Sequence, residues 1–286
     1  MVIETTVNEA LLLARERLAS TSQSAALDAE VLLGAVTGWD QTTRIIRGPT
    51  PLDAAFATDF ERLVNRRLAG EPIAYITGRR EFWSLDMKVS KATLIPREDT
   101  ETLVATAIER IPEDAQWDIL DLGTGSGNIA IAIHSERPKC RIIGVDINPS
   151  AIDLANENAA RLGAESCRFI SGRWFDSLDG DCFHMVIANP PYIRRDDPHL
   201  TIGDVAFEPR AALVSGDDGL DDIGTIVNAA PAHLHQGGWL LLEHGADQAN
   251  KVRELLKSRG FANIFTCNDF GMRERVTGGR AEAACL

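Results

Sequence analysis

Four consecutive residues, Asn189-Pro190-Pro191-Tyr192, combine groups that could bind a planar amino group. The Asn189 carboxamide oxygen and the backbone carbonyl of Pro190 can accept hydrogen bonds from its two N–H groups. The Tyr192 ring offers a flat apolar face for stacking. Because proline has a fixed φ angle, Pro190 and Pro191 form a stiff corner that holds these groups still. The motif therefore predicts chemistry on an NH2 group attached to a π-system.

The motif directly follows residues 184–188, a short apolar run typical of a buried strand. In open α/β sheets, ligands bind at the carboxyl ends of the strands. We therefore expect the motif to lie at that edge of a sheet, where a strand ends.

A glycine-rich segment between a predicted strand at residues 118–122 and a predicted helix at residues 128–136 forms a second candidate site. Glycines let backbone amides approach a ligand at the positive end of a helix. A dinucleotide fingerprint would have its third glycine at position 128, where this chain has Asn128. The G-x-G-x-G spacing resembles the loop of S-adenosylmethionine-dependent methyltransferases more closely than that of NAD enzymes. The loop residues are Gly123, Thr124, Gly125, Ser126 and Gly127.

Two more residues are placed to bind a nucleoside. Asp146 ends the next predicted strand, and an acid about 20 residues beyond the glycines is positioned to accept the ribose hydroxyl groups. The alternative role for Asp146 is to cap the helix that begins at Pro149, but Asn148 is better placed for capping. Trp174 follows the third predicted strand and could either cover an adenine ring or be an ordinary buried tryptophan.

These candidate residues are distributed over a regular alternation of strands and helices. Such alternation predicts an α/β fold with a mostly parallel sheet and helices on both faces. Residues 262–266 and 274–277 could add a terminal antiparallel pair. The predicted strands lie near 118–122, 141–145, 166–170, 184–188 and 238–243, and the predicted helices near 99–110, 128–136, 149–162, 221–235 and 247–259.

The chain divides into three predicted segments. Residues 1–75 carry apolar residues at helical spacing over about 7–18, 24–38 and 56–68, which predicts a small helical bundle. This bundle could dock a substrate or partner, or could be a plain packed cap. Residues 76–96 change to the alternation of a two-stranded β-ribbon and predict a linker. Residues 97–286 form the predicted α/β domain.

The composition limits the possible partners. The 286 residues include 29 basic and 42 acidic ones, and the net charge of −13 disfavours sequence-independent binding to nucleic acid or to an anionic membrane. The N-terminus lacks the charge and apolar pattern of a leader, and no apolar run approaches a membrane span. We therefore expect a cytoplasmic protein. The five cysteines form no C-x-x-C pair, so we expect no metal site.

Over essentially its whole length the sequence resembles the HemK-type release factor glutamine methyltransferases, the PrmC family. The order and spacing of several motifs make chance agreement implausible. Besides the glycine loop and Asn189-Pro190-Pro191-Tyr192, they are Gly70-Glu71-Pro72-Ile73-Ala74-Tyr75, Glu81-Phe82-Trp83, Leu94-Ile95-Pro96-Arg97, Asp99-Thr100-Glu101, Phe207-Glu208-Pro209, Leu242-Glu243-His244-Gly245 and Glu274-Arg275-Val276-Thr277.

The resemblance implies a Rossmann-like class I methyltransferase with a small N-terminal helical domain. It implies transfer of a methyl group from S-adenosyl-L-methionine to the N5 amide nitrogen of the glutamine in the Gly-Gly-Gln motif of peptide chain release factors 1 and 2, leaving S-adenosyl-L-homocysteine. It further implies that Gly123 to Gly127, Asp146 and Trp174 bind the cofactor. Asn189, which also borders the cofactor, would bind the glutamine side chain with Pro190, Pro191 and Tyr192. We expect a monomer without direct nucleic-acid contacts.

The sequence departs from the family pattern in three places. Glu98 stands where a proline is common, which we expect to affect local rigidity rather than chemistry. Arg173 stands before Trp174 where an acid is common, and this puts in doubt an acidic contact to the adenine amino group. A short tail, residues 281–286, follows the expected end.

Other activities remain open at this point. A ribosomal-protein glutamine methyltransferase would have a similar organisation, and a DNA adenine methyltransferase would act on another planar NH2 group but would need a basic groove and base extrusion. The loss of Asn189, Asp146 or the glycine loop would mark a non-catalytic cofactor-binding or scaffold protein, and all three are present. No general base is evident, although His184, His199 and His244 could remove a proton. The loop at residues 194–218 is predicted to border the glutamine pocket.

Overall fold

The computed structural model describes residues 5–178 and 180–282. The chain forms two compact units. The first, here called the helical unit, comprises Met1–Arg79 together with His199–Phe207. The second, the α/β unit, comprises Arg80–Pro198 and Glu208–Leu286.

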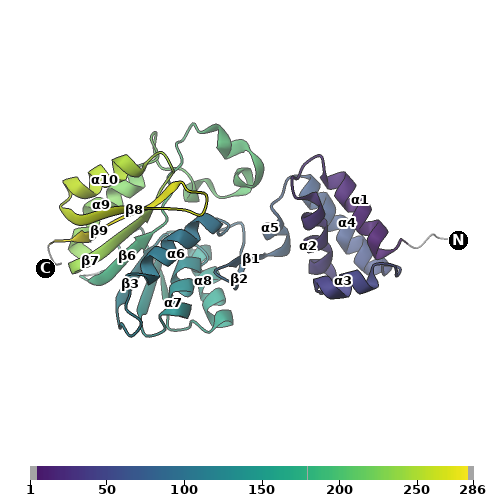
Figure 1. The fold of residues 1–286 in the computed structure, drawn as a ribbon, viewed down its shortest axis with the longest axis horizontal. Helices are drawn as coiled ribbons and strands as arrows, with labels where there is room; N and C mark the ends of the chain where they lie inside the picture. The colour runs from purple at the N-terminus through teal and green to yellow at the C-terminus, as the bar shows by residue number, and fades with distance from the viewer. Residues whose placement is uncertain (1–4, 179, 283–286) are drawn as a thin grey trace. The chain divides into compact units, whose positions relative to one another are not determined.

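The helical unit contains the three predicted helices and two shorter ones (Figure 1). Helix α1 begins with a capping box, in which Thr6 and Glu9 satisfy each other's backbone N–H groups. Buried Leu18, Leu32 and Phe60 from three different helices meet in the core. The two helices that apolar spacing did not predict are short, with seven and five residues. The helices are α1 (Val7–Leu18), α2 (Ala25–Thr37), α3 (Gln41–Arg47), α4 (Ala54–Leu68) and α5 (Ile73–Thr77).

The α/β unit is built on a seven-stranded sheet with the order β5-β4-β3-β6-β7-β9-β8. Strands β3 to β7 are parallel, whereas β9 runs antiparallel to both β7 and β8. The predicted parallel sheet and its terminal antiparallel pair are therefore confirmed. The strands are β3 (Asp118–Leu122), β4 (Arg141–Asp146), β5 (Arg168–Ser171), β6 (Phe183–Ala188), β7 (Leu234–Glu243), β8 (Phe261–Asn268) and β9 (Glu274–Ala281).

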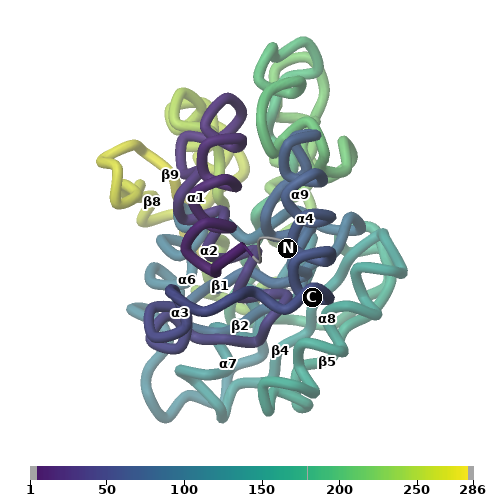
Figure 2. Tube along the Cα trace, turned by 90° about the vertical axis from the view of Figure 1, so that its right-hand side faces the viewer, coloured from purple at the N-terminus to yellow at the C-terminus, as the bar shows by residue number. Residues whose placement is uncertain are grey.

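Helices cover both faces of this sheet (Figure 1). Alternate strand residues point to opposite faces. Ile119 therefore packs in the core under α6, α7 and α8, while its neighbour Leu120 packs in the core under α9 and α10. Helix α8 packs beside β4 and β5 (Figure 2). The helices are α6 (Glu101–Ile108), α7 (Asn128–Glu136), α8 (Pro149–Leu162), α9 (Asp221–Ala229) and α10 (Ala249–Ser258).

A two-stranded ribbon, β1 (Arg79–Phe82) and β2 (Leu85–Lys88), forms where alternation predicted it. Its turn consists of Trp83 and Ser84, both with positive φ angles of 53° and 57° and neither a glycine. Such backbone is strained for residues with side chains, and hydrogen bonds hold it in place. The Trp83 backbone N–H donates to Glu101, and its indole N–H donates to Glu136.

The prediction of one continuous helix over 221–235 is wrong at its end. Helix α9 stops at Ala229, a 3-10 turn covers Ala230–His233, and β7 begins at Leu234. Ile223, Ile226 and Ala230 follow helical spacing, although Ala230 lies beyond the end of α9. All three residues are buried in the same core, so their spacing alone does not show where the helix ends. Pro231, which lacks a backbone donor, is the second residue of the 3-10 turn.

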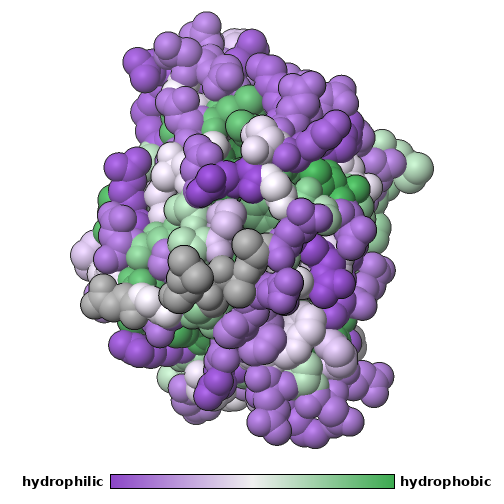
Figure 3. All heavy atoms as spheres, turned by 90° about the vertical axis from the view of Figure 1, so that its left-hand side faces the viewer, coloured by the Kyte–Doolittle hydropathy of each residue, from purple (hydrophilic) through white to green (hydrophobic). Residues whose placement is uncertain are grey.

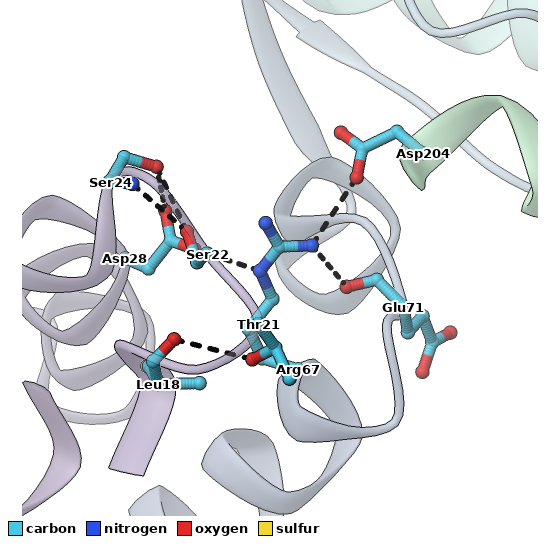
Figure 4. A network of polar contacts seen from close by, with 8 residues as sticks. All are labelled: Leu18, Thr21, Ser22, Ser24, Asp28, Arg67, Glu71 and Asp204. Carbon is cyan, nitrogen blue, oxygen red and sulfur yellow. Dashed lines mark hydrogen bonds and ion pairs between the residues drawn. The ribbon is translucent and has the colours of Figure 1, made fainter. Parts of the chain in front are cut away.

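The segment His199–Phe207 interrupts the α/β unit in sequence but belongs to the helical unit. Arg67 on α4 holds it there (Figure 4): the guanidinium contacts Asp204 at 3.3 Å and Asp28 at 2.8 Å. A side chain at Gly70 would meet the Phe207 ring at 3.2 Å, so the segment packs closely as well. Part of the loop expected to border the glutamine pocket is therefore attached to the bundle.

Hydrophilic residues predominate on the face of the molecule seen in Figure 3, with apolar side chains showing only in patches between them. In the described part of the chain, no helix combines the length and apolar character needed to cross a membrane.

Candidate active site

Strands β3 and β6 meet at the point where the topology of the sheet reverses. The chain proceeds from β3 to β4 and β5 on one side and from β6 to β7 on the other. Ligands of doubly wound sheets bind at the carboxyl end of such a switch point. Leu122 pairs with Ala188, so the residues that follow, Gly123 and Asn189, leave the sheet side by side.

A cavity of about 340 Å³ opens at this edge of the α/β unit. Gly127, Pro190 and Tyr192 do not line it, although the sequence predicted them as site residues. The predicted residues that line the cavity are Gly123, Thr124, Gly125, Ser126, Asp146, Trp174, Asn189 and Pro191.

The first and last glycines of the loop have different surroundings. Gly123 has a φ angle of 71° and faces Trp174, whose ring would lie 3.5 Å from an added Cβ. Gly127, with a φ angle of 80°, is the N-cap of α7. A Cβ there would lie 3.1 Å from Phe169 and 3.2 Å from Ala155. Gly127 therefore permits close helix packing rather than forming the cavity wall.

Asp146 joins the glycine loop to the next helix. Its Oδ2 accepts a hydrogen bond from the Gly125 N–H at 2.9 Å, and its Oδ1 accepts one from the Asn148 N–H at 2.8 Å. Burial raises the pKa of Asp146, and these two bonds oppose the increase. Asn148 caps α8 by accepting from Ser150, as predicted. Since each carboxylate oxygen has a second lone pair, Asp146 can still accept two further hydrogen bonds.

The Trp174 ring lies next to Gly123 at the start of the loop. Trp174 has a positive φ angle of 50°, and its buried indole N–H has no partner among the described residues. Its neighbour Arg173 lies 3.9 Å from Asp222 on α9, and both of these residues line the cavity. An acid is therefore present at this end of the cavity even though position 173 holds arginine.

Asn189 is held by a residue that the sequence analysis did not single out as functional. Its Nδ2 donates to the Thr100 hydroxyl at 3.1 Å. Behind this pair lies the completely buried Glu243, whose Oε1 accepts from the Tyr192 hydroxyl at 3.3 Å. The Glu243 Oε2 has no partner within the described chain. Burial raises the pKa of Glu243 to about 7, although the Thr100 hydroxyl and Arg275 oppose the increase.

Arg275 on β9 makes several of the polar contacts around Thr100 and the end of β7. The guanidinium makes ion pairs with Asp99 at 3.1 Å and with Asp269 at 3.0 Å, and donates to the His244 carbonyl. It thereby anchors the residue before Thr100 to the end of β7.

Glu208 fixes the cavity wall contributed by residues 94–97. This completely buried carboxylate accepts from the Ile95 N–H at 3.0 Å and pairs with Arg97. Glu98, the departure from the family pattern, is exposed and forms an ion pair with Arg80 at 3.4 Å. The family motifs around Thr100, Glu208 and Glu243 were visible in the sequence, but their common location was not.

The three histidines considered for proton removal are not among the residues that line the cavity. His184 is near the amino end of β6 and accepts from the Asp118 N–H at 3.0 Å. Both ring nitrogens of His244 are engaged, at 2.9 Å by the Gly245 carbonyl and at 2.7 Å by Thr277. His199 belongs to the helical unit. No histidine is found among the described residues that line the cavity.

Comparisons with known proteins agree with this architecture. A family model described as the PrmC N-terminal domain matches residues 9–78, and one described as a methyltransferase domain matches residues 113–273. A solved methyltransferase from Pyrococcus furiosus shares the fold, with a TM-score of 0.54 and 15% identity over 76% of this chain and 96% of that one.

Close sequence relatives cover nearly the whole chain. The release factor glutamine methyltransferase of Yersinia pestis is 50% identical over 91% of this chain and 93% of its own length. The enzyme of the same name from Vibrio cholerae is 47% identical over 96% of both chains. That identity extends through the helical unit as well as the α/β unit. The chain belongs to the release factor glutamine methyltransferase family.

Proposed function

We propose that the protein transfers a methyl group from S-adenosyl-L-methionine to the N5 side-chain amide nitrogen of the glutamine in the Gly-Gly-Gln motif of peptide chain release factors 1 and 2. The observation that carries this proposal is the juxtaposition of Asn189 with the glycine loop in one cavity at the switch point of the sheet. Nucleoside-binding features and an amide-binding motif thus share one site.

The residues of the cavity fit this methyl donor. Asp146 has two free acceptor positions for the ribose hydroxyl groups, and Gly123 and Gly125 leave room beside the loop backbone for the amino-acid portion. Trp174 and the exposed apolar Ile147, which also lines the cavity, are suited to flank the adenine ring. Asp222 can accept from the adenine amino group in place of the acid absent at position 173.

When bound, the cofactor supplies an electrophilic methyl group on a sulfonium. An amide nitrogen attacks poorly because its lone pair is delocalised into the carbonyl group. The Asn189 side-chain oxygen and the Pro190 carbonyl would accept the two N–H groups, so that the lone pair points toward the methyl group. Pro191 and Tyr192 would support the corner that holds these acceptors, and positioning supplies most of the acceleration.

We further propose that the enzyme acts as a monomer, because a single chain supplies every group in this scheme. Its place of action would be the cytoplasm, where release factors meet the ribosome. The acidic net charge supports a protein rather than a nucleic-acid substrate.

Transfer of a labelled methyl group tests the proposal directly. Purified release factor and a variant with the Gly-Gly-Gln glutamine replaced would be incubated with enzyme and labelled S-adenosylmethionine, and the products mapped by mass spectrometry. Label confined to that glutamine, and absent from the variant, is the expected result. Label on ribosomal protein or DNA instead would overturn the substrate assignment.

A further inference from the structure

The carboxamide of Asn189 can serve the proposed reaction in only one orientation. Its oxygen accepts hydrogen bonds, whereas its NH2 group only donates. The NH2 group of the substrate therefore has to face the Asn189 oxygen. If the Asn189 carboxamide were turned by 180°, its own NH2 group would face the substrate NH2 group, and neither could accept a hydrogen bond. Something in the protein must select between two orientations of nearly identical shape.

The Thr100 hydroxyl is the group that can make this selection. It lies 3.1 Å from the Asn189 Nδ2 and accepts a hydrogen bond from it. A hydroxyl carries a single proton, so it could equally donate to the Asn189 oxygen and stabilise the opposite orientation. The direction of the bond depends on where the Thr100 proton is directed.

Glu243 supplies an acceptor for that proton. Leu242 pairs with Ala188, which places Glu243 beside Asn189 at the ends of adjacent strands. Its Oε1 accepts from the Tyr192 hydroxyl at 3.3 Å, whereas its buried Oε2 has no hydrogen-bond partner among the described residues and is the acceptor available to the Thr100 hydroxyl. An ionised carboxylate has no proton to give and can only accept.

We propose that Thr100 and Glu243 are positioning residues: the Thr100 hydroxyl donates its hydrogen bond to the otherwise unpartnered Oε2 of Glu243, Thr100 can then only accept from the Asn189 NH2 group, and the Asn189 oxygen faces the cavity. This inference rests on the proposed function for the identity of the group that meets that oxygen. The orientation of Asn189 itself is a property of this chain alone.

The charges around Glu243 make the arrangement sensitive to pH. Burial raises the pKa of Glu243 to about 7, and Asp99 adds to the increase, while the Thr100 hydroxyl, Arg275 and Tyr192 lower it. Above that pH the carboxylate fixes the direction of the chain of hydrogen bonds. Below it the protonated acid can donate to Thr100, which is then free to donate to the Asn189 oxygen. Methyl transfer should therefore fall as the pH drops through about 7.

Single-turnover methylation of release factor tests the kinetic consequence. Thr100→Val keeps the shape but removes the hydroxyl, and should lower the rate constant roughly tenfold, as expected for one lost hydrogen bond. Thr100→Ser should restore most of it. Glu243→Gln should abolish the pH dependence of the rate constant near pH 7. The double variant Thr100→Val, Glu243→Gln should have the same rate constant as Thr100→Val alone. Glu254→Gln, an exposed acid on α10, is the control and should keep the wild-type pH profile.

A second measurement needs neither cofactor nor substrate. The side-chain amide signals of Asn189, identified by their loss in Asn189→Ala, can be followed by NMR in ¹⁵N-labelled protein between pH 5.5 and 8.5, a window of about 1.5 units on either side of the expected transition. The signals should shift near pH 7 in the wild type, and the shift should disappear in Glu243→Gln. In Thr100→Val the amide hydrogens should exchange faster at every pH.

The combined outcomes separate this inference from the proposed function. If the Asn189 amide signals change neither with pH nor in Thr100→Val, the positioning roles of Thr100 and Glu243 would be overturned, even if release factor is methylated. A wild-type protein that methylates no release factor, but whose Asn189 signals respond as expected, would overturn the substrate while supporting the orienting role of Thr100 and Glu243.

Discussion

Asp28 in the helical unit and Glu243 in the α/β unit are both buried carboxylates, yet their surroundings differ. Asp28 accepts hydrogen bonds from Ser22 and Ser24 and makes an ion pair with Arg67, so both of its oxygens are satisfied (Figure 4). Glu243 has the Tyr192 hydroxyl on one oxygen and no partner on the other within the described residues. Burial is nearly the same, at 5% and 1% exposure.

The difference separates a network that stabilises the fold from one that serves the site. A buried acid with a full set of partners resists change, because removing any partner leaves an uncompensated charge. A buried acid with a spare oxygen costs stability, and such costs are tolerated mainly at functional sites. Disrupting the Arg67 network should therefore mainly affect stability, and disrupting the Asn189 network should mainly affect chemistry.

The largest effect is expected for Arg67→Met. It leaves the Asp28 carboxylate without its cation and should lower the free energy of unfolding of the helical unit by about 3 kcal/mol. Urea denaturation measures this loss. Arg62→Met is the matched control, because its ion pair with Asp59 is exposed and should contribute less than about 1 kcal/mol. Equal losses in the two variants would remove the structural role assigned to the network.

The next effect is on turnover. Asn189→Ala should reduce the single-turnover rate constant by roughly 10²-fold, as for the loss of one preorganised hydrogen-bonding group. Affinity for the cofactor should change less. Asn156→Ala on the exposed side of α8 is the control and should retain wild-type kinetics. A near-normal rate for Asn189→Ala would contradict its role in the site.

A smaller effect is expected on cofactor binding. Asp146→Ala removes the acceptor proposed for the ribose hydroxyl groups and should weaken S-adenosylmethionine binding roughly 10- to 30-fold, the equivalent of about one hydrogen bond to a charged group. Isothermal titration calorimetry provides the dissociation constant, with the exposed Asp153→Ala as control. An unchanged constant for Asp146→Ala would exclude Asp146 from the cofactor site.

The last prediction is a change of stability with pH rather than a single difference, and it concerns the stability cost of Glu243 itself. Its pKa of about 7 in the folded protein exceeds the unfolded value of 4.5, so the folded state binds the proton more tightly. The wild type should therefore lose stability, relative to Glu243→Gln, as the pH rises from about 4.5 to 7. The slope is at most about 1.4 kcal/mol per pH unit. Parallel stability curves for the two proteins would mean that the buried carboxyl group does not titrate in this range.

Local patterns were sufficient to predict most of the sheet and part of the site. The strands at 118–122 and 184–188 are apolar runs, and the features that follow them, the glycine loop and Asn189, are contiguous in sequence. The switch point then brings them together, because the carboxyl ends of parallel strands share one edge. For the same reason Asp146, at the end of β4, could be placed in the cavity.

What depends on long-range contacts could not be predicted in this way. Thr100 and Asn189 are 89 residues apart, and Tyr192 and Glu243 are 51 apart, so no local spacing links them. The close packing of Gly127 against Phe169 is likewise visible only in the tertiary structure, and the cofactor-binding role expected for Gly127 remains a prediction. The roles of Pro190 and Tyr192 in binding glutamine remain predictions.

The segment His199–Phe207 has a consequence for dissecting the protein into fragments. An N-terminal fragment that stops near residue 79 would contain Arg67 and Gly70 but would lack Asp204 and Phe207, which cover them. In such a fragment Arg67 would keep its ion pair with Asp28 but lose the one with Asp204, and the surface that Phe207 covers at Gly70 would be exposed. A soluble, well-behaved version of the bundle would need the missing nine residues grafted back through a short linker.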